Sequence, residues 1–496
     1  MAAIPQKSAH TQAAYRSDTL RDFSASPRLL LLAAMALVAG SAGAFAAFLL
    51  LKLIALFTNL AYLQRLSFDP IHLIGDHLPL WTVAIPVIGS IVIGLMARFG
   101  SEKIRGHGIP EAIEAILIGQ SWIEPKVAIL KPLSSAIAIG TGGPFGAEGP
   151  IIMTGGALGS LFAQLFDLSS AERKTLLVAC AAAGMTAVFG TPLAAILLAV
   201  ELLLFEWKPR SFIPVAVAVA VAALWRPYLI GSGPLFPFSG DPAMPLWGLG
   251  LCAAVGVVAG SQSALLTTCL YGVGDLFRKL PIHWMWWPAL GGLVVGIGGL
   301  IDPSALGVGY QNIRALLAGT LDPASAGELL AVKAAIWIVA LSSGTSGGVL
   351  APLLIMGGAL GAIEGHFLPF ADTGFWALLG MAAILGGTMR APLTSTLFAV
   401  ELTADAQLLL PLLVASARLC GHGARHEPLD PDRKNRAARP PYLARIFDRP
   451  VPADAGEGHH GAAGAYIRRI HARCRGGGPD DRGRSAPAQE LSGGRQ

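Results

Sequence analysis

One acidic side chain, Glu148, lies in a Gly- and Pro-rich segment that interrupts apolar runs of membrane length. A carboxylate at that depth costs a few kcal/mol or more, so it persists mainly where it faces a cavity or a pathway. The glycines of residues 140–159 expose backbone N–H groups, and Pro150 suits the first turn of a helix that continues from Ile151. Because free N–H donors at a helix start favour an anion, this segment predicts an anion site with a carboxylate of its own.

A second segment of this kind places His107 between two glycines. Pro110 then fits a first helical turn, and Glu111 and Glu114 suit the positive end of that helix. His107 is either an ordinary loop histidine at the membrane interface or a side chain aimed at a bound ion. Further along, Lys131 either snorkels to an interface or makes the pathway electropositive.

The elements that must position these groups are transmembrane helices. Hydrophobic residues make up 53% of the 496, charged residues only 14%, and the mean hydropathy is +0.59, whereas an average soluble domain is about 25% charged. The apolar runs lack the alternation of a membrane barrel. Several approach the roughly 20 residues that span a bilayer, at 29–51, 80–97, 246–270, 285–301 and 331–343. The sequence therefore predicts an all-α, polytopic membrane protein.

The polar residues lie mainly at the ends of the chain and in loops. Residues 1–28 are polar and carry four basic side chains ahead of the first apolar run, so we expect them to form a cytoplasmic N-terminal segment. The formal charge of +5 comes mostly from tails and loops, which favours a membrane surface over nucleic acid as the partner. The five cysteines show no ligand or disulfide spacing, and we expect neither a metal site nor a cofactor.

The chain contains an internal duplication. The segment that starts at Pro192 and ends at Leu202 recurs 200 residues later, from Pro392 to Leu402, and residues 155–159 recur at 357–361. The partner of the Glu148 segment is thus another Gly-rich break, at residues 344–354. Broken helices at matching positions of two halves point to a binding site at the repeat interface near the membrane midplane. We expect the halves to span residues 29–230 and 231–416.

Three short motifs resemble the filter motifs of the CLC chloride channel and transporter family, in the same order and spacing. They are Gly106-His-Gly-Ile-Pro110, Gly146-Ala-Glu-Gly-Pro150 and Gly348-Val-Leu-Ala-Pro352. The similarity covers roughly residues 25–415. It implies an inverted-repeat helical fold, a homodimer with one pore per subunit, and a multi-pass location in the lipid bilayer, here the inner (plasma) membrane of a bacterium.

The resemblance also assigns roles to residues. Glu148 is expected to be the gate, and chloride is expected to lie where the helix N-termini converge. The anion-binding residues would be His107, Gly108, Ile109, Pro110, Gly146, Ala147, Gly149, Pro150, Gly348, Val349, Leu350, Ala351 and Pro352. Physical reasoning agrees, because partial charges of roughly half an elementary charge at helix ends hold an anion without trapping it.

Three positions depart from the family pattern. The family usually has Ser at His107, Lys or Arg at Ala147, and Phe at Leu350. The larger imidazole puts the anion selectivity or pH dependence in doubt, and the leucine removes an aromatic constriction.

A further departure bears on coupling to protons. Coupled members carry a Glu-Glu pair where this chain has Glu201 followed by Leu202. We therefore expect a passive channel of the voltage-gated type, with a proton-coupled chloride antiporter as the alternative. Glu201 and Glu401 occupy equivalent repeat positions, so we expect both to cap or pair at a helix end.

An enzyme is an alternative from a different functional class. A membrane-embedded enzyme could use Glu148 and His107 as acid and base, but the sequence has no metalloprotease or nucleophile-elbow motif to complete such a site.

Residues 417–496 turn abruptly polar. They form either a disordered tail or the product of a reading-frame shift near Ser416, and we assign Tyr442 no role in the filter.

Overall fold

Helices form almost all of the regular structure. The computed structural model describes residues 27–71, 78–117, 119–238 and 245–417, all within the first of two units (residues 1–446), and the second unit, Phe447–Gln496, lies outside them. Within the described residues the β-type pairings are two isolated bridges, Gly106 with Ser346 and Gly146 with Gly348. The predicted all-α fold is confirmed.

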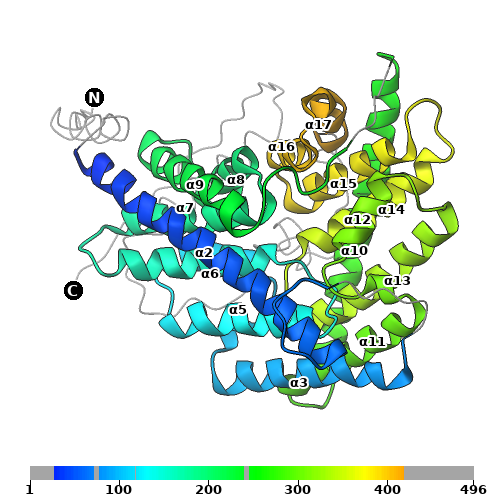
Figure 1. The fold of residues 1–496 in the computed structure, drawn as a ribbon, viewed down its shortest axis with the longest axis horizontal. Helices are drawn as coiled ribbons and strands as arrows, with labels where there is room; N and C mark the ends of the chain where they lie inside the picture. Colours follow the sequence, from blue (N-terminus) through cyan, green and yellow to red (C-terminus); the bar gives the residue numbers. More distant parts are fainter. Residues whose placement is uncertain (1–26, 72–77, 118, 239–244, 418–496) are drawn as a thin grey trace, which may run out of the picture. The chain divides into compact units, whose positions relative to one another are not determined.

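The helices form two successive series along the chain (Figure 1). The first comprises α2 (Pro27–Leu63), α3 (Ala84–Phe99), α4 (Ile109–Leu117), α5 (Pro125–Gly140), α6 (Glu148–Ala163), α7 (Ser170–Phe189), α8 (Pro192–Leu198), the π-helical segment Ala199–Leu204 and α9 (Pro209–Leu229). The second comprises α10 (Gly248–Lys279), α11 (Trp287–Ile301), α12 (Tyr310–Leu317), α13 (Pro323–Ser342), α14 (Leu350–Gly365), α15 (Thr373–Met389), α16 (Pro392–Thr403) and α17 (Leu409–Ala417).

Proline and capping residues explain where many helices begin. Proline opens α5, α8, α9, α13 and α16, a position where its missing N–H costs nothing. Helix α7 begins with a capping box in which Ser169 and Glu172 each accept the other's backbone N–H. These local signals set the helix starts independently of hydropathy.

The expected spans are correct in place but too short. Helix α2 runs to Leu63, beyond the run at 29–51, and α10 runs to Lys279, beyond 246–270. The run at 331–343 is only the second half of α13. Polar residues at the ends of an apolar run do not stop a helix, so hydropathy marks its centre better than its limits.

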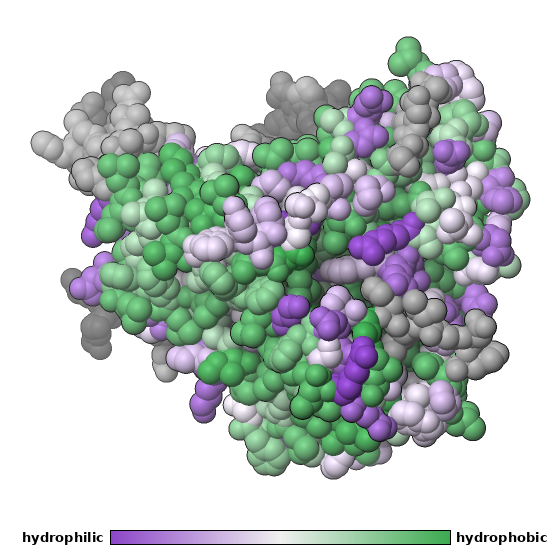
Figure 2. All heavy atoms as spheres, viewed as in Figure 1, coloured by the Kyte–Doolittle hydropathy of each residue, from purple (hydrophilic) through white to green (hydrophobic). Residues whose placement is uncertain are grey.

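Exposed apolar side chains cover the outer faces of the long helices. Six helices among the described residues are long and apolar enough to cross a membrane. Leu30, Leu49, Leu265 and Ile297 are examples of large apolar residues exposed on them. Figure 2 shows that hydrophobic residues occupy much of the visible face. This surface suits lipid and identifies a multi-pass integral membrane protein.

The two series pack in matching ways. Helix α6 packs on α7 as α14 packs on α15, and α8 of the first series meets α16 of the second (Figure 1). Small residues allow the close contacts: a Cβ added to Gly155 would lie 2.7 Å from the Cys180 carbonyl oxygen, and one added to Gly357 would lie 2.5 Å from that of Gly380. The duplicated sequence thus builds a duplicated arrangement of helices.

Candidate anion-binding site

The three motifs, far apart in the sequence, meet in space. The backbone N–H of Gly146 donates to the Gly348 carbonyl oxygen at 3.0 Å, and the N–H of Gly348 donates back to Gly146 at 2.9 Å. The N–H of Gly347 donates to the Gly106 carbonyl oxygen at 3.4 Å. Reciprocal backbone bonds therefore join the second motif to the third, and a single bond joins the first motif to the residue just before the third.

A helix begins within each motif. Helix α4 starts at Ile109, α6 at Glu148 and α14 at Leu350, so the proline that ends each motif lies in a first turn as predicted. Their partial positive ends gather around the backbone junction of Gly146 and Gly348. Besides the N–H groups of Gly146 and Gly348, that of Gly108 is also used, because it donates to the Glu111 carboxylate at 2.7 Å.

The Glu148 carboxylate lies inside this junction. Its side chain is 0% exposed, and neither oxygen makes a hydrogen bond of good geometry within the described residues. The backbone N–H groups of Glu148 itself and of Ala351 still act as weak donors to it, outside good hydrogen-bond geometry. A Cβ added to Gly348 would lie 2.8 Å from its Oε2 atom, so glycine is needed there. The geometry holds a negative charge between the starts of α6 and α14.

Gly149, the residue that follows Glu148, lies next to both the first and the third motif. Gly149 lies against the His107 carbonyl oxygen and close to Gly348, since a Cβ added to it would be 3.2 Å from the Gly348 Cα. His107 is partly exposed, while Ala147 and Leu350 are buried. All residues that the sequence nominated thus lie in one place, and their roles toward an ion remain predictions.

Lys131 does not reach a membrane interface, so the snorkelling interpretation is wrong. Its side chain is 0% exposed, and Nζ donates to the carbonyl oxygens of Ile104 at 2.8 Å and Gly106 at 2.9 Å. The ammonium therefore fixes the loop that precedes the first motif. Helix packing, which hydropathy does not report, determines this depth.

Sequence reasoning missed a second buried lysine. Lys333 is also 0% exposed, and its Nζ donates to the carbonyl oxygens of Ala305 at 2.8 Å and Gly307 at 2.9 Å. It follows Lys131 by 202 residues, so the duplication contained the signal that predicts it.

Glu201 and Glu401 each cap a helix of the opposite half, as their equivalent repeat positions predicted. Glu401 accepts the backbone N–H groups of Leu193 at 2.9 Å and Ala194 at 2.8 Å, at the start of α8. Glu201 accepts the N–H and the hydroxyl of Thr394 at the start of α16. Leu202, the position without the expected carboxylate, is buried at 3% exposure.

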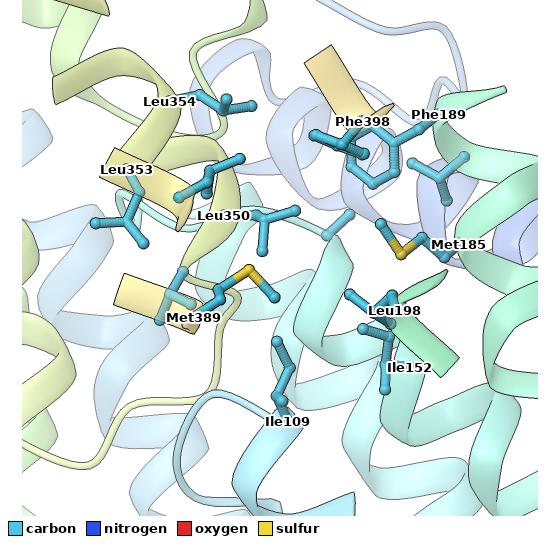
Figure 3. Packing of buried hydrophobic residues seen from close by; sticks show 14 of the residues in the cluster. Ile109, Ile152, Met185, Phe189, Leu198, Leu350, Leu353, Leu354, Met389 and Phe398 are labelled. Atoms are coloured by element: carbon cyan, nitrogen blue, oxygen red, sulfur yellow. The ribbon is translucent and has the colours of Figure 1, made fainter. Parts of the chain in front are cut away.

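A buried apolar cluster includes residues near the starts of α4, α6 and α14. Ile109, Ile152, Leu198 and Leu350, from four different helices, are buried and converge (Figure 3). Phe189 packs edge-on against Phe398 with ring centroids 5.2 Å apart, and Phe236 against Tyr310 at 5.6 Å. These aromatics, which sequence reasoning did not nominate, come from distant segments. The predicted tail, its reading-frame hypothesis and Tyr442 lie outside the described residues.

Comparison with known proteins agrees with this geometry. A family model described as "Voltage gated chloride channel" matches residues 88–418. The chain is 29% identical over 378 residues to the H(+)/Cl(-) exchange transporter ClcA of Salmonella arizonae, covering 71% of this chain and 78% of that protein. It is 28% identical over 349 residues to the putative chloride channel protein ClcB-like of Ralstonia nicotianae, covering 68% and 81%.

Solved structures share the fold. A slow cyanobacterial Cl-/H+ antiporter superimposes with a TM-score of 0.70 at 22% identity, covering 85% of this chain and 98% of that one. A CLC-type fluoride/proton antiporter gives 0.67 at 18% identity, covering 80% and 96%. The duplicated helices, the three motifs joined at one junction and the family match together lead to one conclusion: this chain belongs to the CLC family of membrane proteins, which transports anions.

Proposed function

We propose that the protein exchanges chloride for protons across the membrane, and that Glu148 is the gate for both ions. The observation that carries the proposal is the fully buried Glu148 carboxylate between the starts of α6 and α14. Neither of its oxygens has a hydrogen-bond partner of good geometry among the described residues. A negative charge so placed competes with a halide for the same partial positive charges.

Competition for one position couples the two ions. When Glu148 is ionised, its own charge occupies the helix ends. When it binds a proton, the charge is gone and the helix ends can accept chloride instead. If Glu148 takes up its proton from the side to which chloride leaves and releases it to the side from which chloride enters, the two ions move in opposite directions.

The relatives favour exchange over the passive channel that the sequence alone suggested. The Salmonella relative is named an H(+)/Cl(-) exchange transporter, and two similar structures are proton antiporters of chloride or fluoride. Leu202 supports the channel as a second candidate, because a buried leucine cannot carry a proton. In an exchanger, the proton would therefore reach Glu148 by a path that avoids position 202.

Further proposals concern the anion ligands, the two halves and the assembly. We propose that backbone N–H groups of the three motifs bind the anion, other than those of Gly108, Gly146 and Gly348, which already donate within the protein. We also propose that His107 influences the anion selectivity. Residues 29–230 and 231–416 would form the two halves, with residues 1–28 on the cytoplasmic side. We further propose a homodimer in the inner membrane of a bacterium.

Glu148→Gln tests the gate. The amide is close in shape to the carboxylate but cannot cycle a proton, so we expect chloride flux from liposomes to persist while proton movement falls to background. Glu328→Gln, at an exposed carboxylate on α13, should leave both unchanged. Loss of chloride flux from correctly folded Glu148→Gln protein, or retained proton movement, would contradict the proposal.

A further inference from the structure

A guanidinium is buried near the end of α9 with no carboxylate beside it. Arg226 is only 9% exposed, and it forms no ion pair among the residues that the structure describes. Two carbonyl oxygens hold it instead, because Nη1 donates to that of Gly231 at 3.0 Å and to that of Gly233 at 2.8 Å. Carbonyl groups orient a cation without neutralising it, and a buried charge without a counter-charge is costly.

The guanidinium lies against Gly190, the residue that ends α7. A Cβ added to Gly190 would lie 2.6 Å from Arg226 Cζ and 2.8 Å from Nε, so only glycine allows this approach. The Nε atom is buried there, and it makes no hydrogen bond within the described part of the chain. One N–H group of a buried cation is therefore left without an acceptor.

The next residue along the chain provides a second unused donor. Thr191 is 0% exposed, and its hydroxyl has no hydrogen-bond partner in the described ranges. Thr191 stands at the N-cap of α8 but does not cap it. The carboxylate of Glu401 already accepts the backbone N–H groups of Leu193 and Ala194. The hydroxyl thus has no function in capping the helix.

The second half shows that the turn does not need this hydroxyl. Ala391 is the N-cap of α16, 200 residues after Thr191. Its φ of −126° and ψ of 76° nearly match the −118° and 71° of Thr191. The same backbone therefore forms with a methyl side chain. Because a buried hydroxyl without a partner lowers stability, a ligand accounts for its presence in the first half.

We infer that Arg226 and Thr191 form a second anion-binding site, for a small monovalent inorganic anion such as chloride. An anion accepts hydrogen bonds from Nε–H and from the hydroxyl, and its charge offsets that of the guanidinium, whereas a water molecule only accepts. Neither residue belongs to the three motifs. The site is therefore separate from the Glu148 junction and is expected in an exchanger and in a channel alike.

Bromide, which scatters X-rays anomalously, locates the site in crystals of the full-length protein. We expect an anomalous peak within hydrogen-bond distance of Arg226 Nε and Thr191 Oγ1. A peak at the Glu148 junction with none beside Arg226 would overturn the inference and leave the proposed function intact. A peak beside Arg226 with none at the junction would support the inference and count against the proposed anion site.

The dependence of Tm on chloride tests the site in detergent solution. Thr191→Val keeps the side-chain shape, and losing one hydrogen bond to a charged group weakens binding about tenfold. The chloride-induced rise in Tm should therefore be smaller than in wild type. Thr186→Val, which removes a buried hydroxyl that donates to the Ala182 carbonyl oxygen at 2.9 Å, should keep the full rise.

Arg226→Gln removes the charge and provides a second variant. Its Tm without chloride should fall, because Gly231 and Gly233 lose their donor, so only the rise on adding chloride is compared. We expect that rise to be at least as small as in Thr191→Val. Equal rises in wild type and both variants would show that no anion binds at this site.

Discussion

At the scale of the residue, two buried charges organise the site: the Glu148 carboxylate between the starts of α6 and α14, and the Lys131 ammonium on the carbonyl groups of Ile104 and Gly106. Glu148 was identifiable because a carboxylate among glycines inside an apolar region usually faces an ion pathway or a cavity. Lys131 was not, since its sequence context fits both an interface and the interior. Its burial depends on carbonyl groups at Ile104 and Gly106 that turn inward in the loop before α4. Such carbonyl directions are invisible in a hydropathy pattern.

Lys131→Met should destabilise the protein. The change leaves two buried carbonyl oxygens without their donor, and each unpaired group costs about 1–3 kcal/mol. We therefore expect the free energy of unfolding in detergent to fall by at least about 2 kcal/mol. Lys126→Met, at an exposed lysine of the same helix, should change it little. Equal stability of the two variants would show that the ammonium does not hold the loop.

At the scale of the element, local sequence signals predicted helix starts better than helix ends. Pro110, Pro150 and Pro352 each lie in a first turn, as expected from their fixed backbone angle. The aromatic packing was not predictable, because Phe236 comes from the loop after α9 and packs against a residue of α12. Contacts of that kind depend on the path of the chain and not on its local pattern.

The reciprocal caps between the halves should affect the stability of the protein and leave its transport unchanged. Glu401→Ala removes the acceptor of two backbone N–H groups at the start of α8, and losing a cap of this type costs about 1–2 kcal/mol. We expect the Tm to fall and the number of protons moved per chloride to stay the same. Glu201→Ala, the repeat partner, should behave alike. Altered coupling at unchanged Tm would assign these carboxylates to the proton path instead.

The helix ends that follow α7 and α15 give a second prediction. Gly190 ends α7 with φ of 71°, and Arg390 ends α15 with φ of 55°, 200 residues later. Because a non-glycine residue is strained in this region, Arg390→Gly should raise the free energy of unfolding by up to about 1 kcal/mol. Gly190→Ala should lower it, since the added Cβ would lie 2.6 Å from Arg226 Cζ. Destabilisation by Arg390→Gly would reveal a stabilising contact of the arginine side chain.

At the scale of the whole molecule, the duplication was the most informative feature of the sequence. It predicted the paired broken helices and the capping roles of Glu201 and Glu401. It also implied that Lys333 is buried like Lys131, a prediction that was missed. What the repeat could not supply is the mechanism, because the same architecture serves both exchangers and channels. The absent carboxylate at Leu202 pointed to a channel, whereas the relatives point to exchange.

Residues 418–496 carry one prediction that the structure does not address. If the polar composition after Ser416 comes from a reading-frame shift, resequencing the underlying DNA will recover an apolar continuation of the chain. An intact frame would exclude the hypothesis and establish the tail as authentic.

The most direct test of the account is whether a chloride gradient drives protons uphill. Purified wild-type protein in liposomes, given a chloride gradient and no initial pH gradient, should produce proton movement opposite to the chloride movement, recorded by a pH electrode. Glu148→Gln should release chloride without this proton movement. Chloride flux from the wild type with no accompanying proton movement would contradict exchange and leave the passive channel as the function of this site.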